Sequence, residues 1–136
     1  MKRLLSSKAI NTDLAFLILR VFVGTTMLFS HGLGKMMKFF EPGDIKFANV
    51  FGMGEVPSLV LAVFAEVICA GLIAVGAYTR LASIALGITM AVAAFSIHAD
   101  DPFSKKEFAL LYLVPCIVLF LTGPGKYSVD QKILKR

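Results

Sequence analysis

The amino-acid sequence predicts an all-α fold, an integral membrane bundle of four helices that forms one domain over residues 1–136. Composition is the first indication, because 57% of the 136 residues are hydrophobic and 17% are charged, whereas soluble domains are about 45–50% apolar and about 25% charged. The mean hydropathy of +0.80 is the second, since a short chain exposes much of its surface to the surrounding solvent. Third, the apolar residues gather in four runs that are long enough to cross a bilayer.

The first predicted span covers residues 14–33, which matches the roughly 20 residues that a helix needs to cross the hydrocarbon core. Lys2 and Arg3 precede it, as in a secretory signal peptide, but the sequence SHGLGK at residues 30–35 contains no small-x-small cleavage pattern. We therefore expect an uncleaved span.

An outer interfacial loop is predicted over residues 35–56. It either covers the bundle or gates a site. Phenylalanines between charged residues predict a short helix lying in the membrane interface, at Phe39, Phe40, Phe47 and Phe51.

The second span is predicted at residues 57–78, where Pro57 suits a first helical position and Glu66 is the only charge. Thr79 and Arg80 leave only a tight turn before the third span, residues 81–98. These two spans are therefore expected to form an antiparallel hairpin.

The fourth span is predicted at residues 105–122. A capping box at residues 104–107 indicates its start, and the Gly-Pro-Gly sequence at residues 123–125 indicates its end. A cytoplasmic tail follows at residues 123–136, with a short amphipathic helix expected after Ser128.

Orientation follows from the basic residues in the short flanks of the spans. One side holds eight of them: Lys2, Arg3, Lys8, Arg80, Lys126, Lys132, Lys135 and Arg136. The other side holds five: Lys35, Lys38, Lys46, Lys105 and Lys106. Both termini are therefore predicted to face the cytoplasm.

Two charges fall deep within predicted spans, where each costs roughly 2.5–3.5 kcal/mol on insertion scales. Glu66 lies near the middle of its span and must be protonated, paired or directed into a wet cavity. Arg20 can either pair with Glu66 or extend its side chain to the cytoplasmic headgroups. Arg20 and His31 are eleven residues apart, so a regular helix would place them on one face.

The outer ends of the spans hold further polar residues. His31 and His98 lie at similar depth and suit hydrogen bonding at the interface; haem ligation by the pair is the less favoured interpretation. Acids, bases and a phenol gather beside them and could bind a polar headgroup, move protons or simply form a charged rim. The candidate binding cluster comprises Arg20, His31, Lys35, Glu66, His98, Asp101 and Tyr112, and its candidate catalytic residues are Glu66, His31 and His98.

Other classes of site find no support in the sequence. Cys69 and Cys116 lie within apolar runs and form no CxxC motif, so we expect neither a metal site nor a catalytic dithiol. The net charge of +5 has no accompanying stripe of arginine and aromatic residues, and we expect no nucleic-acid partner.

An ordered set of short segments resembles the DoxX family from about Leu14 to Asp130. The matching pieces are Leu19-Arg20 with Gly24, FSHGLGK at 29–35, FAEV at 64–67, YTRLA at 78–82, HADDPF at 98–103, KE at 106–107 and GPGKYS at 123–128. The positions that match the recurring pattern of the family are Arg20, His31, Lys35, Glu66, Arg80, His98 and Asp101. The resemblance implies a four-helix protein of the bacterial inner membrane, a subunit of a quinone-linked oxidoreductase system.

Three functional hypotheses remain open. The first is a redox subunit that binds a quinone near His31 and His98 and acts with a partner protein, since no soluble domain is present to hold another redox centre. The second is a non-enzymatic module of the bilayer that assembles with partners or with itself, in which Arg20 and Glu66 lock the bundle. The third is a small-solute or proton transporter, against which the absence of inverted repeats and broken helices argues.

Overall fold

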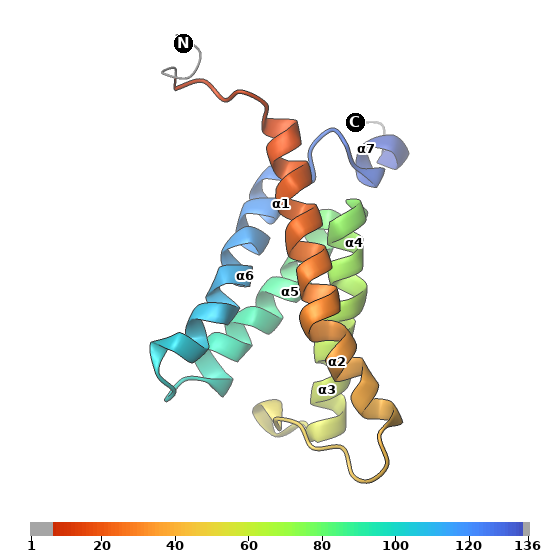
Figure 1. The fold of residues 1–136 in the computed structure, drawn as a ribbon, viewed down its shortest axis with the longest axis vertical. Coiled ribbons are helices and arrows are strands. Elements are labelled where there is room, and N and C mark those ends of the chain that lie inside the picture. Colours follow the sequence, from red (N-terminus) through yellow and green to blue (C-terminus); the bar gives the residue numbers. More distant parts are fainter. Residues whose placement is uncertain (1–6, 135–136) are drawn as a thin grey trace.

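The computed structural model describes residues 7–134, which form helices and turns and contain no strand (Figure 1). The all-α prediction is therefore confirmed for this part of the chain. Three helical segments within it are long and apolar enough to cross a membrane, namely Thr12–Phe40, Glu55–Val75 and Thr79–Ile97. The fourth long helix, α6 (Phe103–Thr122), carries three charged residues near its start, so its apolar part is the shorter stretch at 108–122.

The first helical segment consists of α1 (Thr12–Met27), a π-helical turn (Leu28–Gly32), α2 (Leu33–Met37) and a 3₁₀ turn (Lys38–Phe40). It begins where the Asn11 side chain accepts a hydrogen bond from the backbone N–H of Leu14 at 3.0 Å. The helix continues seven residues beyond its predicted end, because a glycine inside a helix costs only about 1 kcal/mol. Lys35 therefore lies on a helix and not in the loop.

The second segment consists of α3 (Glu55–Val63), a π-helical turn (Phe64–Cys69) and α4 (Ala70–Val75). It ends at Gly76, whose φ of 74° suits the left-handed conformation that glycine adopts without strain. The turn between the second and third segments is thus residues 76–78.

The predicted turn at Thr79 and Arg80 was wrong, because both residues belong to the first turn of α5 (Thr79–Val92). A third π-helical turn (Ala93–Ile97) follows α5 directly.

The predicted capping box at residues 104–107 was also wrong. Helix α6 begins at Phe103, behind Pro102, and no side chain caps it. The extended ψ of 151° at Pro102 ends the preceding turn, and the carbonyl of Pro102 accepts the N–H of Lys105 at 3.0 Å.

The connection over residues 41–54 contains one 3₁₀ turn, Val50–Gly52, in place of the predicted interfacial helix. Its residues Gly43, Gly52 and Gly54 all have positive φ, which interrupts a helical backbone. The expected tail helix is present as α7 (Val129–Leu134), whose start is capped by Ser128 through the N–H of Gln131 at 3.3 Å.

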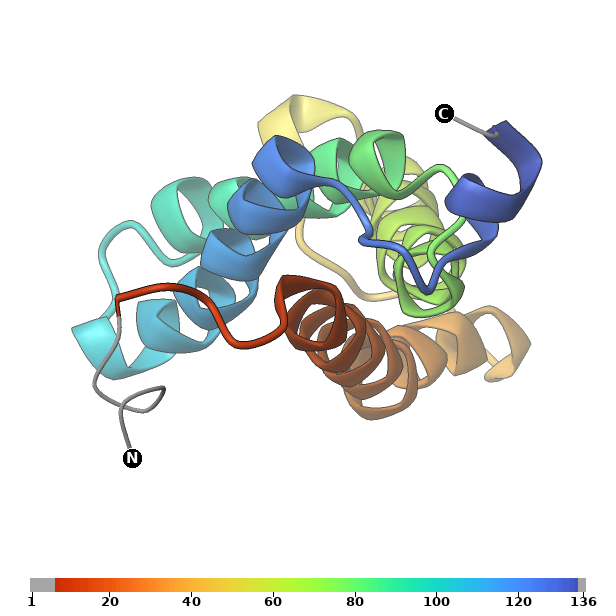
Figure 2. The ribbon, with the colours of Figure 1, turned by 90° about the horizontal axis from the view of Figure 1, so that it is seen from above.

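The start of α1 and helix α7 lie at one end of the bundle, and the connections 41–54 and 98–102 lie at the other (Figures 1 and 2). Lys2, Arg3, Lys135 and Arg136, which contribute to the predicted orientation, lie outside the described residues.

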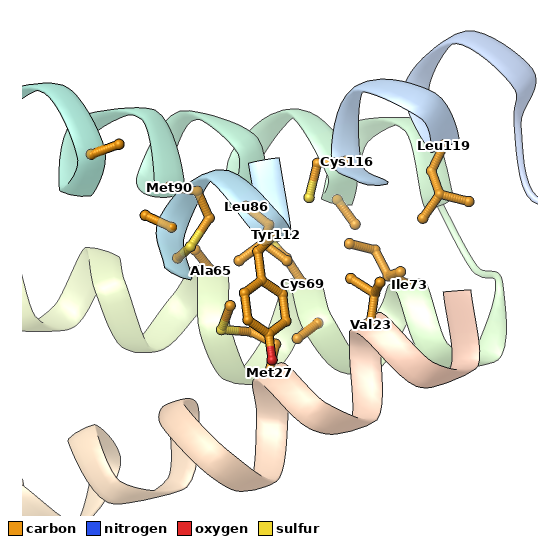
Figure 3. Packing of buried hydrophobic residues seen from close by; sticks show 14 residues of the cluster. Val23, Met27, Ala65, Cys69, Ile73, Leu86, Met90, Tyr112, Cys116 and Leu119 are labelled. Atoms are coloured by element: carbon orange, nitrogen blue, oxygen red, sulfur yellow. The ribbon is translucent and has the colours of Figure 1, made fainter. Parts of the chain in front are cut away.

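Helix α1 packs along α4, and α5 packs along α6. Side chains from all four long helical segments meet in a buried core, in which the Tyr112 hydroxyl points toward α1 (Figure 3). Both cysteines, Cys69 and Cys116, are buried there with free thiols.

Candidate functional site

A cavity of about 210 Å³ lies near the end of the bundle that carries the connections 41–54 and 98–102. Four of the seven candidate binding residues line it: His31, Lys35, Glu66 and His98. The remaining walls include the apolar side chains of Met27, Met90 and Ala93. The cavity therefore combines ionisable groups with an apolar lining.

Each of the first three helical segments reaches this cavity through its π-helical turn. His31 lies in the first π turn, Glu66 in the second and Ala93 in the third. The i to i−5 hydrogen bond of such a turn is seen directly where the N–H of His98 donates to the carbonyl of Ala93 at 3.0 Å. Single π turns are rare and occur often at functional sites, so three around one cavity favour a binding role.

The carboxylate of Glu66 forms an ion pair with Lys35. The Lys35 ammonium lies 2.5 Å from each carboxylate oxygen, and the Glu66 side chain is only 2% exposed. Lys35 is 29% exposed, and both residues line the cavity. The ion pair therefore extends from the buried Glu66 carboxylate to the more accessible Lys35 ammonium. Glu66 is therefore paired, which is one of the three states that its depth allowed.

The His31 ring packs against two aromatic rings of α6, tilted against Phe108 and edge-on to Tyr112. Its centroid lies 4.4 Å from that of Phe108 and 5.9 Å from that of Tyr112. The two aromatic rings are themselves 5.1 Å apart. This contact fixes the His31 imidazole at the cavity wall and brings the predicted residue Tyr112 next to it.

His98 is held by Asp101, the last of the predicted residues on this side. Nδ1 of His98 lies 2.6 Å from the carboxylate, and because a carboxylate only accepts, Nδ1 is the donor. This hydrogen bond, with the nearby Lys105, holds the pKa of the Asp101 carboxyl below its ordinary value of 3.8. The pair therefore persists to a lower pH than a free aspartate would allow, and Nε2 remains as the second nitrogen of His98.

Arg20 lies away from this cluster and does not pair with Glu66. Its guanidinium donates to the backbone carbonyl of Ala74 at 2.5 Å and to that of Tyr127, and its side chain is only 2% exposed. The second expectation, an extended side chain in the headgroups, also fails because the residue is buried. Arg20 instead attaches the segment after α6 to α1 and α4.

Lys105 and Phe108 line the cavity as well, although the sequence did not single them out. The sequence contains a signal for Phe108, because it lies one helical turn before the predicted site residue Tyr112 and therefore on the same helix face. Among residues 7–134, no group of three or more His, Cys, Asp or Glu side chains could hold a metal ion.

We expect Arg20→Met to release the segment before α7. The substitution removes two hydrogen bonds to backbone carbonyls, which would increase the rate of tryptic cleavage after Lys126 by about tenfold, as for a loss of about 1.5 kcal/mol. Limited proteolysis followed by mass spectrometry measures this rate. Lys38→Met, at the opposite end, is the control, and equal cleavage of both variants would contradict the role given to Arg20.

These features define a helical membrane protein with a polar cavity, lined by histidines and an ion pair, near one end of its bundle. Residues 15–99 match the DoxX family, and because this is more than half of the chain, the protein belongs to that family. The membership predicted from the sequence is thus confirmed. The matched region contains His31, Lys35, Glu66 and His98, and ends before Asp101.

Two uncharacterized proteins of Haemophilus influenzae are similar to this chain. One is 30% identical over 135 residues, which cover 94% of this chain and 89% of that protein. The other is 28% identical over 117 residues, which cover 81% of this chain and 84% of that protein. No solved structure matches the chain.

Proposed function

We propose that this DoxX-family membrane protein binds a quinone headgroup in the cavity and serves as a subunit of a quinone-linked oxidoreductase system. The observation that carries the proposal is the convergence of His31, His98 and the Lys35–Glu66 pair on one small cavity beside an aromatic wall. A quinone offers two carbonyl oxygens as hydrogen-bond acceptors and a flat ring, which suit imidazole donors and aromatic side chains.

The size of the cavity favours a single-ring headgroup. Its volume of about 210 Å³ is smaller than the roughly 300–1,000 Å³ of sites that enclose drug-sized ligands. The ring would occupy the cavity, and the long apolar tail of the quinone would lie among lipid chains outside it.

The ionisable residues have separate roles in the proposal. As an imidazolium beside the Asp101 carboxylate, His98 keeps its Nδ1–H on Asp101 and donates its Nε2–H to one quinone oxygen. Reduction to quinol also consumes two protons and two electrons. His31 and the Lys35–Glu66 pair supply protons at the headgroup, and a partner redox protein supplies the electrons.

The proposed setting is a bacterial inner membrane that all four long helices cross, with both termini cytoplasmic. The basic-residue count supports this orientation, and the cavity would then face the outer side. The apolar stretch of α6, residues 108–122, spans about 22 Å at 1.5 Å per residue, and its charged first turn would lie in the headgroups.

The test is a quinone analysis of the protein purified in mild detergent. We expect lipid extracts to contain stoichiometric quinone, and His98→Gln to lower its amount about tenfold, as for one lost hydrogen bond that leaves a buried group unpaired. Lys46→Gln, an exposed residue of the 41–54 connection, is the matched control. A reduced-minus-oxidised spectrum of the same sample tests for haem.

If no quinone copurifies and added quinone fails to bind, the redox proposal is contradicted. A non-enzymatic assembly module then becomes the favoured function. The observation that favours this second candidate is that Arg20 and Glu66 are both buried and both occupied by internal contacts. In that case Glu66→Gln would lower stability and accumulation without any redox phenotype.

A further inference from the structure

A second cavity, of about 460 Å³, lies at the end of the bundle that carries α7, away from the proposed quinone site. It is bounded by the start of α5, the end of α6 and the start of α7 through Thr79, Arg80, Gly123, Asp130 and Gln131. The Arg80 guanidinium packs beside Gly123, since a Cβ on that glycine would lie 3.6 Å from both Nε and Nη2.

Within residues 7–134, Arg80 forms no ion pair. Asp130 lines the same cavity, but its carboxylate is already occupied. One of its oxygens accepts the N–H of Tyr78 at 2.6 Å, and the other accepts the N–H of Thr79 at 2.9 Å. Arg80 thus has no carboxylate of the described residues within ion-pair distance, and the negative charge of Asp130 in the same cavity is held by the first backbone amides of α5.

An apolar groove of about 260 Å³ continues along the same two helices, α5 and α6. On the α5 side its lining includes three small residues, Ser83, Gly87 and Ala91. Ile88, on its rim, is 60% exposed, which for a membrane protein means contact with lipid chains. The arginine-bearing cavity and the apolar groove thus follow one another along a single helix seam.

Two buried hydroxyl groups accompany this seam. Thr79 lines the first cavity and Ser83 lines the groove one helical turn further on. Within the described residues neither hydroxyl has a hydrogen-bond partner. Buried polar groups without partners are uncommon in proteins, and here they coincide with the two hollows.

We propose that this seam binds an anionic phospholipid, with its phosphate at Arg80 and an acyl chain in the groove beside Ser83, Gly87 and Ala91. A positive group followed by an apolar channel is complementary to a molecule with an anionic head and an apolar chain. Basic pockets between transmembrane helices are suited to such headgroups. The inference is independent of the proposed quinone site, which lies at the other end.

Native mass spectrometry of the full chain in detergent tests the proposal. Phosphatidylglycerol and phosphatidylcholine with identical acyl chains are titrated separately. We expect the wild-type protein to prefer phosphatidylglycerol, and Arg80→Gln to weaken its binding about fivefold to tenfold. Phosphatidylcholine, whose phosphate charge is offset by its choline, should lose less affinity, so the preference between the two lipids should shrink. Arg80 is exposed, so this substitution is compatible with folding.

Lys126→Gln is the matched control, because it removes one exposed positive charge at the same end without lining the cavity. It should leave the preference intact. Ala91→Phe fills the groove and should weaken the binding of both lipids. Equal loss of phosphatidylglycerol binding in Arg80→Gln and Lys126→Gln would overturn the proposal in favour of general charge attraction. Displacement of the lipid by inorganic phosphate alone would overturn it in favour of a free-phosphate site.

Discussion

Glu66→Gln is expected to lower the free energy of unfolding by about 2–3 kcal/mol. Removing one partner of a buried ion pair costs roughly 3–5 kcal/mol, because the remaining charge loses its compensation. The expected loss is smaller here because Lys35 is 29% exposed, which lets solvent and headgroups stabilise its ammonium after the substitution. Chemical unfolding in mixed micelles measures the difference.

A double-mutant cycle separates the ion pair from the shape of the Glu66 side chain. Lys35→Met alone leaves the carboxylate of Glu66 buried and unpaired, and should destabilise the protein at least as strongly as Glu66→Gln. The combined variant removes both charges, so its loss should fall short of the sum of the single losses by about 1–2 kcal/mol. Strict additivity would show that the two side chains contribute independently.

Glu41→Gln provides the matched control for that cycle. Glu41 is an exposed glutamate in the connection 41–54, so its substitution should change stability by no more than about 0.5 kcal/mol. Comparing the two glutamates isolates the effect of position, since the chemical change is the same.

The positions of the long helices could be predicted from the sequence because each corresponds to one apolar run. The predicted helix ends were less accurate where the sequence contains a glycine, because a glycine can either end a helix or lie within one. The first span was predicted to end at residue 33, between Gly32 and Gly34, but both glycines lie within a continuing helix. Gly76 does end a helix, and it differs in adopting a positive φ, which the sequence alone does not specify.

The ionisable residues of the candidate site could also be predicted, since charges and histidines stand out in apolar segments. The partner of each ionisable residue could not be predicted from the sequence. The expectation that Arg20 and His31 share one face assumed a regular period of 3.6 residues. The π turn at residues 28–32 adds one residue to a turn, which rotates all later positions by about 100°. Arg20 lies before this turn and bonds to carbonyls at one end of the bundle, whereas Lys35 lies after it and pairs with Glu66 near the other end.

A single added methyl group is expected to have opposite effects at two glycines of the first two helical segments. At Gly24 a Cβ would lie 2.5 Å from the carbonyl oxygen of Ala70 and 2.7 Å from the backbone nitrogen of Ala74. Both are backbone atoms, so α1 and α4 must separate. We expect Gly24→Ala to lower the free energy of unfolding by about 2–3 kcal/mol.

Gly71→Ala, in α4, is the matched control, because no atom lies within 4 Å of a Cβ at that position. The alanine should raise stability by up to about 1 kcal/mol through its greater helix propensity. Unfolding of both variants under the same micellar conditions tests the difference in sign. Two variants of equal stability would mean that the close backbone contact between α1 and α4 does not exist.

The cost at Gly24 reflects how helices associate in lipid. Lipid chains are as apolar as the side chains between helices, so burial from water adds little, and close packing through small residues provides much of the attraction. Separating α1 from α4 would therefore lose favourable contacts along both helices. Gly32 makes a similar close approach to the backbone of Glu66. We therefore expect Gly32→Ala both to destabilise the bundle and to weaken the coupling between Lys35 and Glu66 in the double-mutant cycle, whereas Gly71→Ala leaves that coupling unchanged.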